Sequence, residues 1–152
     1  MGARNELVEA FASAVPFALR EMANVEAVAR DACRNATAPS ADLFASIRLT
    51  AADGEGRLVL CFSTATATAL ARRVLADVTD DPSEEMVRDC LGEVANVVAG
   101  QAKALLVGSP SHFTLSAPTV WVCDAAPPAH ECWEIAFASD VGEFTVRLYP
   151  PT

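Results

Sequence analysis

Positive charge is scarce in this chain of 152 residues. Lys and Arg total 11 against 20 Asp and Glu, which gives a formal net charge of −9 at pH 7, and the basic residues are scattered along the sequence. Binding to nucleic-acid phosphates or to an anionic membrane surface requires clustered Lys and Arg. We therefore expect no nucleic acid and no membrane among the partners of this protein.

The sequence also lacks the cysteine spacings of a disulfide-linked or zinc-binding domain. Cys33, Cys61, Cys90, Cys123 and Cys132 are odd in number and contain no C-x-x-C pair. That pattern fits neither a disulfide framework nor a zinc site. Most of these cysteines lie in apolar runs, so we expect buried thiols and no metal site.

Long apolar runs are missing as well. No stretch reaches the roughly 18 uninterrupted apolar residues that a membrane span needs, and residues 1–6 do not begin the apolar core of a signal peptide. We therefore expect a cytoplasmic protein. A hydrophobic content of 52% is ample for a core, and the length suits a single domain over residues 1–152.

Two familiar catalytic motifs are absent. The glycine-rich segment 53–56 is not followed by Gly-Lys-Ser or Gly-Lys-Thr, and no helix is expected to begin there, so we interpret it as a hairpin turn rather than a phosphate loop. The serines have no G-x-S-x-G setting, and the two histidines have no partner at metal-ligand spacing.

Periodicity predicts an α+β fold. Asn5 is the expected cap of a first helix that Pro16 should kink and that Asn24 should end in a left-handed conformation. Residues 30–40 give no clear prediction. The expected elements are a helix over 5–22, strands over 43–50 and 57–63, a helix from Ser63 or Thr64 to about residue 78, a long helix from 82 to just before Gly108, and strands over 119–123, 132–138 and 143–149. Helices separated by hairpins indicate a two-layer sandwich of a largely antiparallel sheet and long helices.

The long helix is expected to begin at Asp81-Pro82-Ser83-Glu84. In this prediction Asp81 is the capping acceptor, Pro82 takes the first helical position, and Glu84 reaches back from the third.

This helix has two faces of different chemistry. The predicted buried stripe is Val87, Leu91, Val94, Val98, Ala102 and Leu105. The opposite face carries Asp89, Glu93, Asn96, Gly100 and Lys103. A glycine inside a helix costs about 1 kcal/mol relative to alanine. Because Gly92 and Gly100 flank the Glu93/Asn96 pair, we expect another surface to approach the helix there.

The segment from Asp89 to Lys103 resembles the signature helix of the CheC/CheX/FliY chemotaxis phosphatases, CheX above all. Their D/S-x-x-x-E-x-x-N pattern is matched at Asp89, Glu93 and Asn96, and Ala-Gly-Gln-Ala-Lys follows at 99–103. The resemblance extends to the first helix, to the turn at 54–58 and to Pro-Thr-Val at 118–120. One copy of the motif is present, as in CheX.

The resemblance implies a protein phosphatase that removes the aspartyl phosphate of a CheY-type response-regulator receiver domain. Asn96 would orient the attacking water and Glu93 would pair with a receiver lysine, while Asp89 and Gly100 would contact the partner. The divalent metal, Mg²⁺, would be held by the receiver, so we expect no cofactor of this chain's own. The resemblance also implies a homodimer.

Three alternatives stay open. Glu93 and Asn96 would form a plain solvated helix face if the surrounding pattern were ignored. A protein of the same fold could bind a receiver or a flagellar-switch partner without turning it over. An enzyme for small phosphate esters ranks last, because the sequence lacks metal ligands and a basic phosphate clamp.

Overall fold

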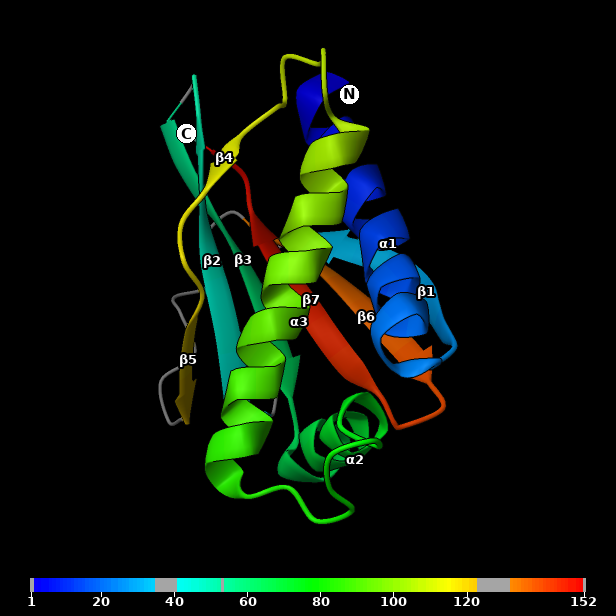
Figure 1. Cartoon of the computed structure of the whole chain (residues 1–152). Helices are drawn as coiled ribbons and strands as arrows, with labels where there is room; N and C mark the ends of the chain where they lie inside the picture. The colour runs from blue at the N-terminus through cyan, green and yellow to red at the C-terminus, as the bar shows by residue number, and fades with distance from the viewer. Residues whose placement is uncertain (1, 35–40, 53, 123–131, 152) are drawn as a thin grey trace.

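The computed structural model describes residues 2–34, 41–52, 54–122 and 132–151. Within these ranges three helices lie on one face of an antiparallel seven-stranded sheet (Figure 1). The elements are α1 (Gly2–Ala23), β1 (Ala27–Arg34), β2 (Leu43–Ala51), β3 (Gly54–Phe62), α2 (Thr64–Val74), α3 (Glu84–Leu105), β4 (Thr114–Leu115), β5 (Thr119–Val122), β6 (Trp133–Ser139) and β7 (Phe144–Tyr149). This confirms the predicted α+β fold with an antiparallel sheet.

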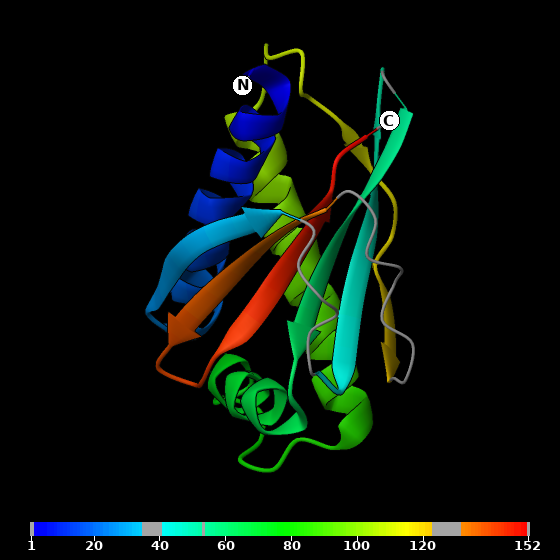
Figure 2. The ribbon, with the colours of Figure 1, turned by 180° about the vertical axis from the view of Figure 1, so that it is seen from behind.

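The strand order places the two hairpins side by side. It runs β1-β6-β7-β3-β2, and both β4 and β5 pair with the outer edge of β2. Figure 2 shows the sheet from behind, with β1 at one side and β5 at the other. The central strands of the sheet are therefore β7 and β3. The helices cover one face of this sheet (Figure 1).

The core forms where the alternating side chains of the strands meet the helices. Phe144, Val146 and Leu148 of β7 are buried toward the helices, as their period of two predicts. Phe144 lies between two other rings, with centroid distances of 4.9 Å to Phe62 and 5.2 Å to Phe137. Aromatic pairs at these separations add to the stabilisation from buried area. This cluster holds the centre of the sheet beneath the helix layer.

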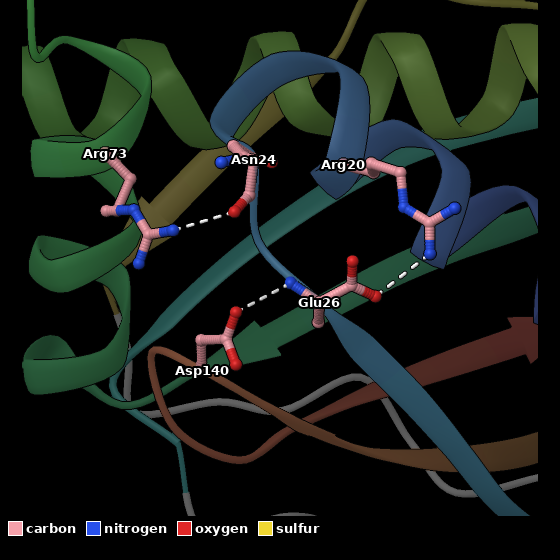
Figure 3. Close-up of polar contacts among 5 residues, drawn as sticks. All are labelled: Arg20, Asn24, Glu26, Arg73 and Asp140. Atoms are coloured by element: carbon pink, nitrogen blue, oxygen red, sulfur yellow. Dashed lines mark hydrogen bonds and ion pairs between the residues drawn. The ribbon is translucent and has the colours of Figure 1, made fainter.

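Polar contacts tie the lower end of the helix layer to the sheet (Figure 3). Asn24 has φ 53°, which confirms its predicted left-handed conformation. Arg73 of α2 donates a hydrogen bond of 2.7 Å to the Asn24 carbonyl. The Glu26 backbone N–H donates to Asp140 Oδ2 at 2.9 Å, and Arg20 pairs with the Glu26 carboxylate at 2.9 Å. The α1–β1 turn is thus fastened both to α2 and to the β6–β7 turn.

Four local predictions need correction or completion. Asn5 lies inside α1, which begins at Gly2, because the helix formers Ala3 and Arg4 extend it toward the N-terminus. Residues 27–34 form β1, and they do so because they pair with β6. Gly54 to Gly56, predicted as part of a turn, belong to β3 opposite Leu49 to Ala51, while residue 53 lies outside the described residues. Pro16 lies within α1, which continues to Ala23.

The cysteines largely follow the prediction. Cys61, Cys90 and Cys132 are buried and Cys33 is exposed, whereas Cys123 lies outside the described residues. Burial raises the pKa of the Cys61 thiol to about 12. This thiol is therefore neutral near pH 7. None of the described helices has an apolar stretch of the length that a membrane crossing requires.

Candidate functional site

Helix α3 runs along the helix-side face of the sheet, with α2 beside its lower end and α1 beside its upper part in the view of Figure 1. Its N-terminal cap is Ser83, whose hydroxyl accepts a hydrogen bond of 3.2 Å from the Met86 N–H. The predicted cap was therefore wrong by two residues, and Pro82 precedes the helix. The reason is local: the Asp81 N–H donates to Thr79 Oγ1, so Asp81 belongs to the preceding turn.

The inner face of α3 is buried, as its periodicity predicts. Its buried residues are Val87, Cys90, Leu91, Gly92, Val94, Ala95, Val98, Ala99 and Ala102. Leu105 is the exception, because it is 51% exposed while Leu106 is buried. The Leu106 N–H bonds to the Lys103 carbonyl, three residues back, so the last turn tightens and brings Leu106 inward.

The outer face of α3 carries the predicted functional residues. Asp89, Glu93 and Asn96 are exposed, and Gly100 and Lys103 are partly exposed. Glu93 and Asn96 are neighbours on the helix surface because they lie three residues apart. Neither side chain makes a hydrogen bond or ion pair with any residue in the described ranges. Their polar atoms are thus available to a partner.

The two glycines that flank this pair have different surroundings. A Cβ atom at Gly92 would lie 3.5 Å from Cγ2 of Val120 and 3.7 Å from Cγ of Pro118. The surface that approaches the helix at Gly92 is therefore the segment leading into β5 of the same chain. At Gly100 a Cβ atom would meet nothing within 4 Å. Internal packing does not account for that glycine.

A buried thiol lies beneath the polar pair. Burial, and to a lesser degree the Glu93 carboxylate, raises the pKa of Cys90 to about 11. Cys90 is therefore neutral near pH 7 and is a poor nucleophile. The thiol therefore adds no nucleophile to the face that carries Glu93 and Asn96.

Other candidate groups lie away from α3's outer face. The described residues contain no cluster of three His, Cys, Asp or Glu side chains that could hold a metal ion. His112 is partly buried next to Phe113, with ring centroids 6.5 Å apart, and His130 lies outside the described residues. One cavity of about 170 Å³ opens beside the N-termini of α2 and α3, and another of about 390 Å³ opens between the C-terminal ends of α1 and α2. Neither Glu93 nor Asn96 lines them.

The exposed face continues beyond the residues that the sequence singled out. Ala104 is exposed, and Val107, just after the helix, is 73% exposed. The signal was available in the sequence, because the spacing of three and four that runs from Glu93 through Gly100 extends to both. The outer face therefore changes along its length from acidic to apolar.

The chain belongs to the CheX family: the family described as chemotaxis phosphatase CheX matches residues 44–128, which include all of α3. No curated protein matches the chain.

Solved structures support the same fold. The chemotaxis protein CheX from Desulfovibrio desulfuricans is 26% identical, with a TM-score of 0.82 over 94% of this chain and 97% of that one. The CheX of a CheX–CheY–BeF₃–Mg²⁺ complex from Borrelia burgdorferi is 21% identical, with a TM-score of 0.77 over 95% and 97%. The middle domain of FliM from H. pylori is 14% identical, with a TM-score of 0.58 over 96% and 92%. The last two likenesses concern the fold alone.

Proposed function

We propose that this protein is a phosphatase that hydrolyses the aspartyl phosphate of a CheY-type receiver domain. The observation that carries the proposal is the pair Glu93 and Asn96, adjacent and exposed on the outer face of α3 without a partner among the described residues. Family membership supports the chemistry, because the matched residues 44–128 contain both side chains.

Asn96 supplies what hydrolysis of an aspartyl phosphate requires of a second protein. The attacking water must lie in line with the phosphorus, opposite the leaving carboxylate. A side-chain amide both donates and accepts hydrogen bonds, so it can orient that water. It also carries no charge, whereas a carboxylate at the same place would be repelled by the phosphoryl group. Asn96 is the water-positioning residue in this proposal.

Glu93 sets the position of the helix on the receiver. Its carboxylate pairs with the active-site lysine of the receiver, one helical turn from the water held by Asn96. Asp89 and Gly100 lie on either side along the same face and contact the docked receiver. Because the receiver holds the Mg²⁺ ion, α3 needs to bring only these side chains.

The partner proposed here agrees with a complex of a related fold. The Borrelia burgdorferi CheX was crystallised with CheY in the presence of BeF₃ and Mg²⁺. Beryllofluoride stands in for the phosphoryl group of the receiver aspartate. That complex supports a phosphorylated receiver as the partner of this chain, with the divalent cation in the assembled complex.

The test is phosphate release from a panel of purified receivers encoded by the same genome, each phosphorylated with a small phosphodonor, with and without this protein. We expect at least one receiver to lose its phosphoryl group faster, and the acceleration to vanish with Asn96→Ala. A receiver that binds but is not dephosphorylated faster would replace the proposal with a non-enzymatic receiver-binding or flagellar-switch module. No binding to any receiver would overturn both.

We also propose a homodimer joined through the edge of the sheet. Within the described ranges β1 pairs only with β6, so its other side is an open edge. Open edges tend to be paired or covered. Pairing of two β1 strands across a two-fold axis would leave both α3 faces free for receivers. Light scattering at micromolar concentration should give the mass of a dimer; a monomer would contradict this arrangement.

A further inference from the structure

The outer face of α3 ends in exposed apolar residues. The Val107 N–H bonds to the Ala104 carbonyl at 3.4 Å, which is a spacing of three residues. Side chains three residues apart in such a tight turn lie one above the other. Val107 therefore continues the line of Asn96, Gly100 and Ala104, and it is 73% exposed.

The opposite end of α3 is acidic. Glu84 and Glu85 are exposed on its first turn, and the preceding loop adds exposed Asp77, Asp80 and Asp81. None of these five carboxylates forms an ion pair within the described ranges. The C-terminal half differs, because residues 94–122 contain no Asp or Glu and Lys103 supplies the only charge. Glu6 of α1 approaches that end, where it accepts hydrogen bonds from the hydroxyls of Ser109 and Ser111.

This asymmetry matters because Glu93 and Asn96 are too few to hold a protein. A specific interface commonly buries about 800 Å² on each partner, or roughly 20–30 residues. The rest of the footprint must fall on one side of the pair or the other. A phosphorylated receiver presents a phosphoryl group and the carboxylates that hold its metal ion, so the acidic end of α3 opposes it. The C-terminal end offers Lys103 and apolar surface instead.

Resting on the proposed function, we infer that the receiver docks over α3 from Asp89 and Glu93 toward the C-terminal end of the helix. Ala104 and Val107 make an apolar contact with it, and the open space at Gly100 admits its backbone between that contact and Asn96. Ala104 lies about 12 Å along the helix from Asn96, at a rise of 1.5 Å per residue. That distance falls within the footprint of one small domain.

Two equally exposed valines give a matched test. Val107 is 73% exposed at the proposed contact, and Val78 is 71% exposed in the loop between α2 and α3, at the acidic end. Calorimetric titration against a beryllofluoride-locked receiver should show about tenfold weaker binding for Val107→Asp. Val78→Asp should change the affinity by less than about twofold. Circular dichroism checks that both variants are folded.

Turnover provides a second readout. Because Val107 contacts the receiver away from the phosphoryl group, Val107→Asp should raise the receiver concentration needed for half-maximal rate and leave the maximal rate within about threefold. Equal effects of the two substitutions, or a larger effect of Val78→Asp, in a wild-type protein that dephosphorylates receivers would overturn this inference alone. A wild-type protein that binds no receiver would overturn the proposed function with it.

Discussion

The two faces of α3 differ in whether packing within this protein accounts for their residues. The inner face is buried and apolar, and each of its side chains packs against the sheet or a neighbouring helix. The outer face carries Glu93 and Asn96, whose polar atoms find no partner among the described residues. Folding thus accounts for the inner face and not for the outer one. Substitutions on the inner face should cost stability, and those on the outer face should cost function.

The largest effect is expected from the inner face. Leu91 is fully buried, so Leu91→Ala removes apolar contacts and leaves a cavity. Such changes reduce the free energy of unfolding by about 2–5 kcal/mol. Urea denaturation followed by circular dichroism measures the change. Glu93→Ala is the matched control on the outer face and should stay within about 0.5 kcal/mol of the wild type.

Asn96→Ala should reduce activity and leave stability nearly unchanged, the reverse of Leu91→Ala. Without the amide the attacking water is no longer held, and accelerated dephosphorylation should fall roughly 100-fold or more. Receiver affinity should stay within a few-fold, because the assigned role is confined to the transition state. The rate of phosphate release from the receiver, at a saturating concentration of the variant, measures the loss. Retained activity in a folded variant would refute the role given to Asn96.

Glu93→Lys is expected to act on binding rather than on stability. The substitution places two cations together where a Glu–Lys pair is proposed, so affinity for a beryllofluoride-locked receiver should fall by about tenfold. Isothermal titration calorimetry decides the point, with Glu93→Gln as the variant that removes charge without reversing it. Unchanged affinity for the lysine variant would show that Glu93 lies outside the interface.

The smallest effects are expected from alanine substitutions at the two glycines, Gly92 and Gly100. Gly100→Ala should raise the free energy of unfolding by about 0.5–1 kcal/mol, since alanine favours helix and its Cβ meets nothing within 4 Å. The same methyl group should weaken receiver binding a few-fold by filling the space where the partner approaches. Gly92→Ala, whose Cβ would touch Val120 and Pro118, should leave binding unchanged. Thermal melts and titrations of the two variants compare stability with affinity.

The sequence predicts the strong elements of this fold and misses those that depend on their neighbours. Strands β2, β3, β6 and β7 follow from short apolar segments, alternating in β7 and continuous in β3, and from bounding turns, and the structure confirms them. Strand β1 was missed because residues 27–34 contain Val28 as their only large apolar side chain, so their extended form comes from pairing with β6. The two-residue strand β4 exists only as a pairing with β2.

The residues of the candidate site were easier to predict from the sequence than the two ends of the helix that carries them. A helical period sorts residues by face, so the exposure of Glu93 and Asn96 and the burial of Leu91 follow from spacing alone. Both ends of α3 were harder. At the start, Ser83 and Asp81 are equally good caps in sequence, and only the hydrogen bond to Thr79 commits Asp81 to the turn. At the end, a three-residue hydrogen bond shifts the buried position from Leu105 to Leu106.

The outward position of Glu93 and Asn96 has a bearing on selectivity in a crowded cell. A small phosphate ester meets these side chains from solvent, and on this face of α3 only Lys103 carries positive charge to hold an anion. Abundant phosphorylated metabolites would therefore compete poorly for the pair. For a receiver phosphatase, this means that turnover follows the amount of phosphorylated partner and is insulated from the metabolic pool of phosphate compounds.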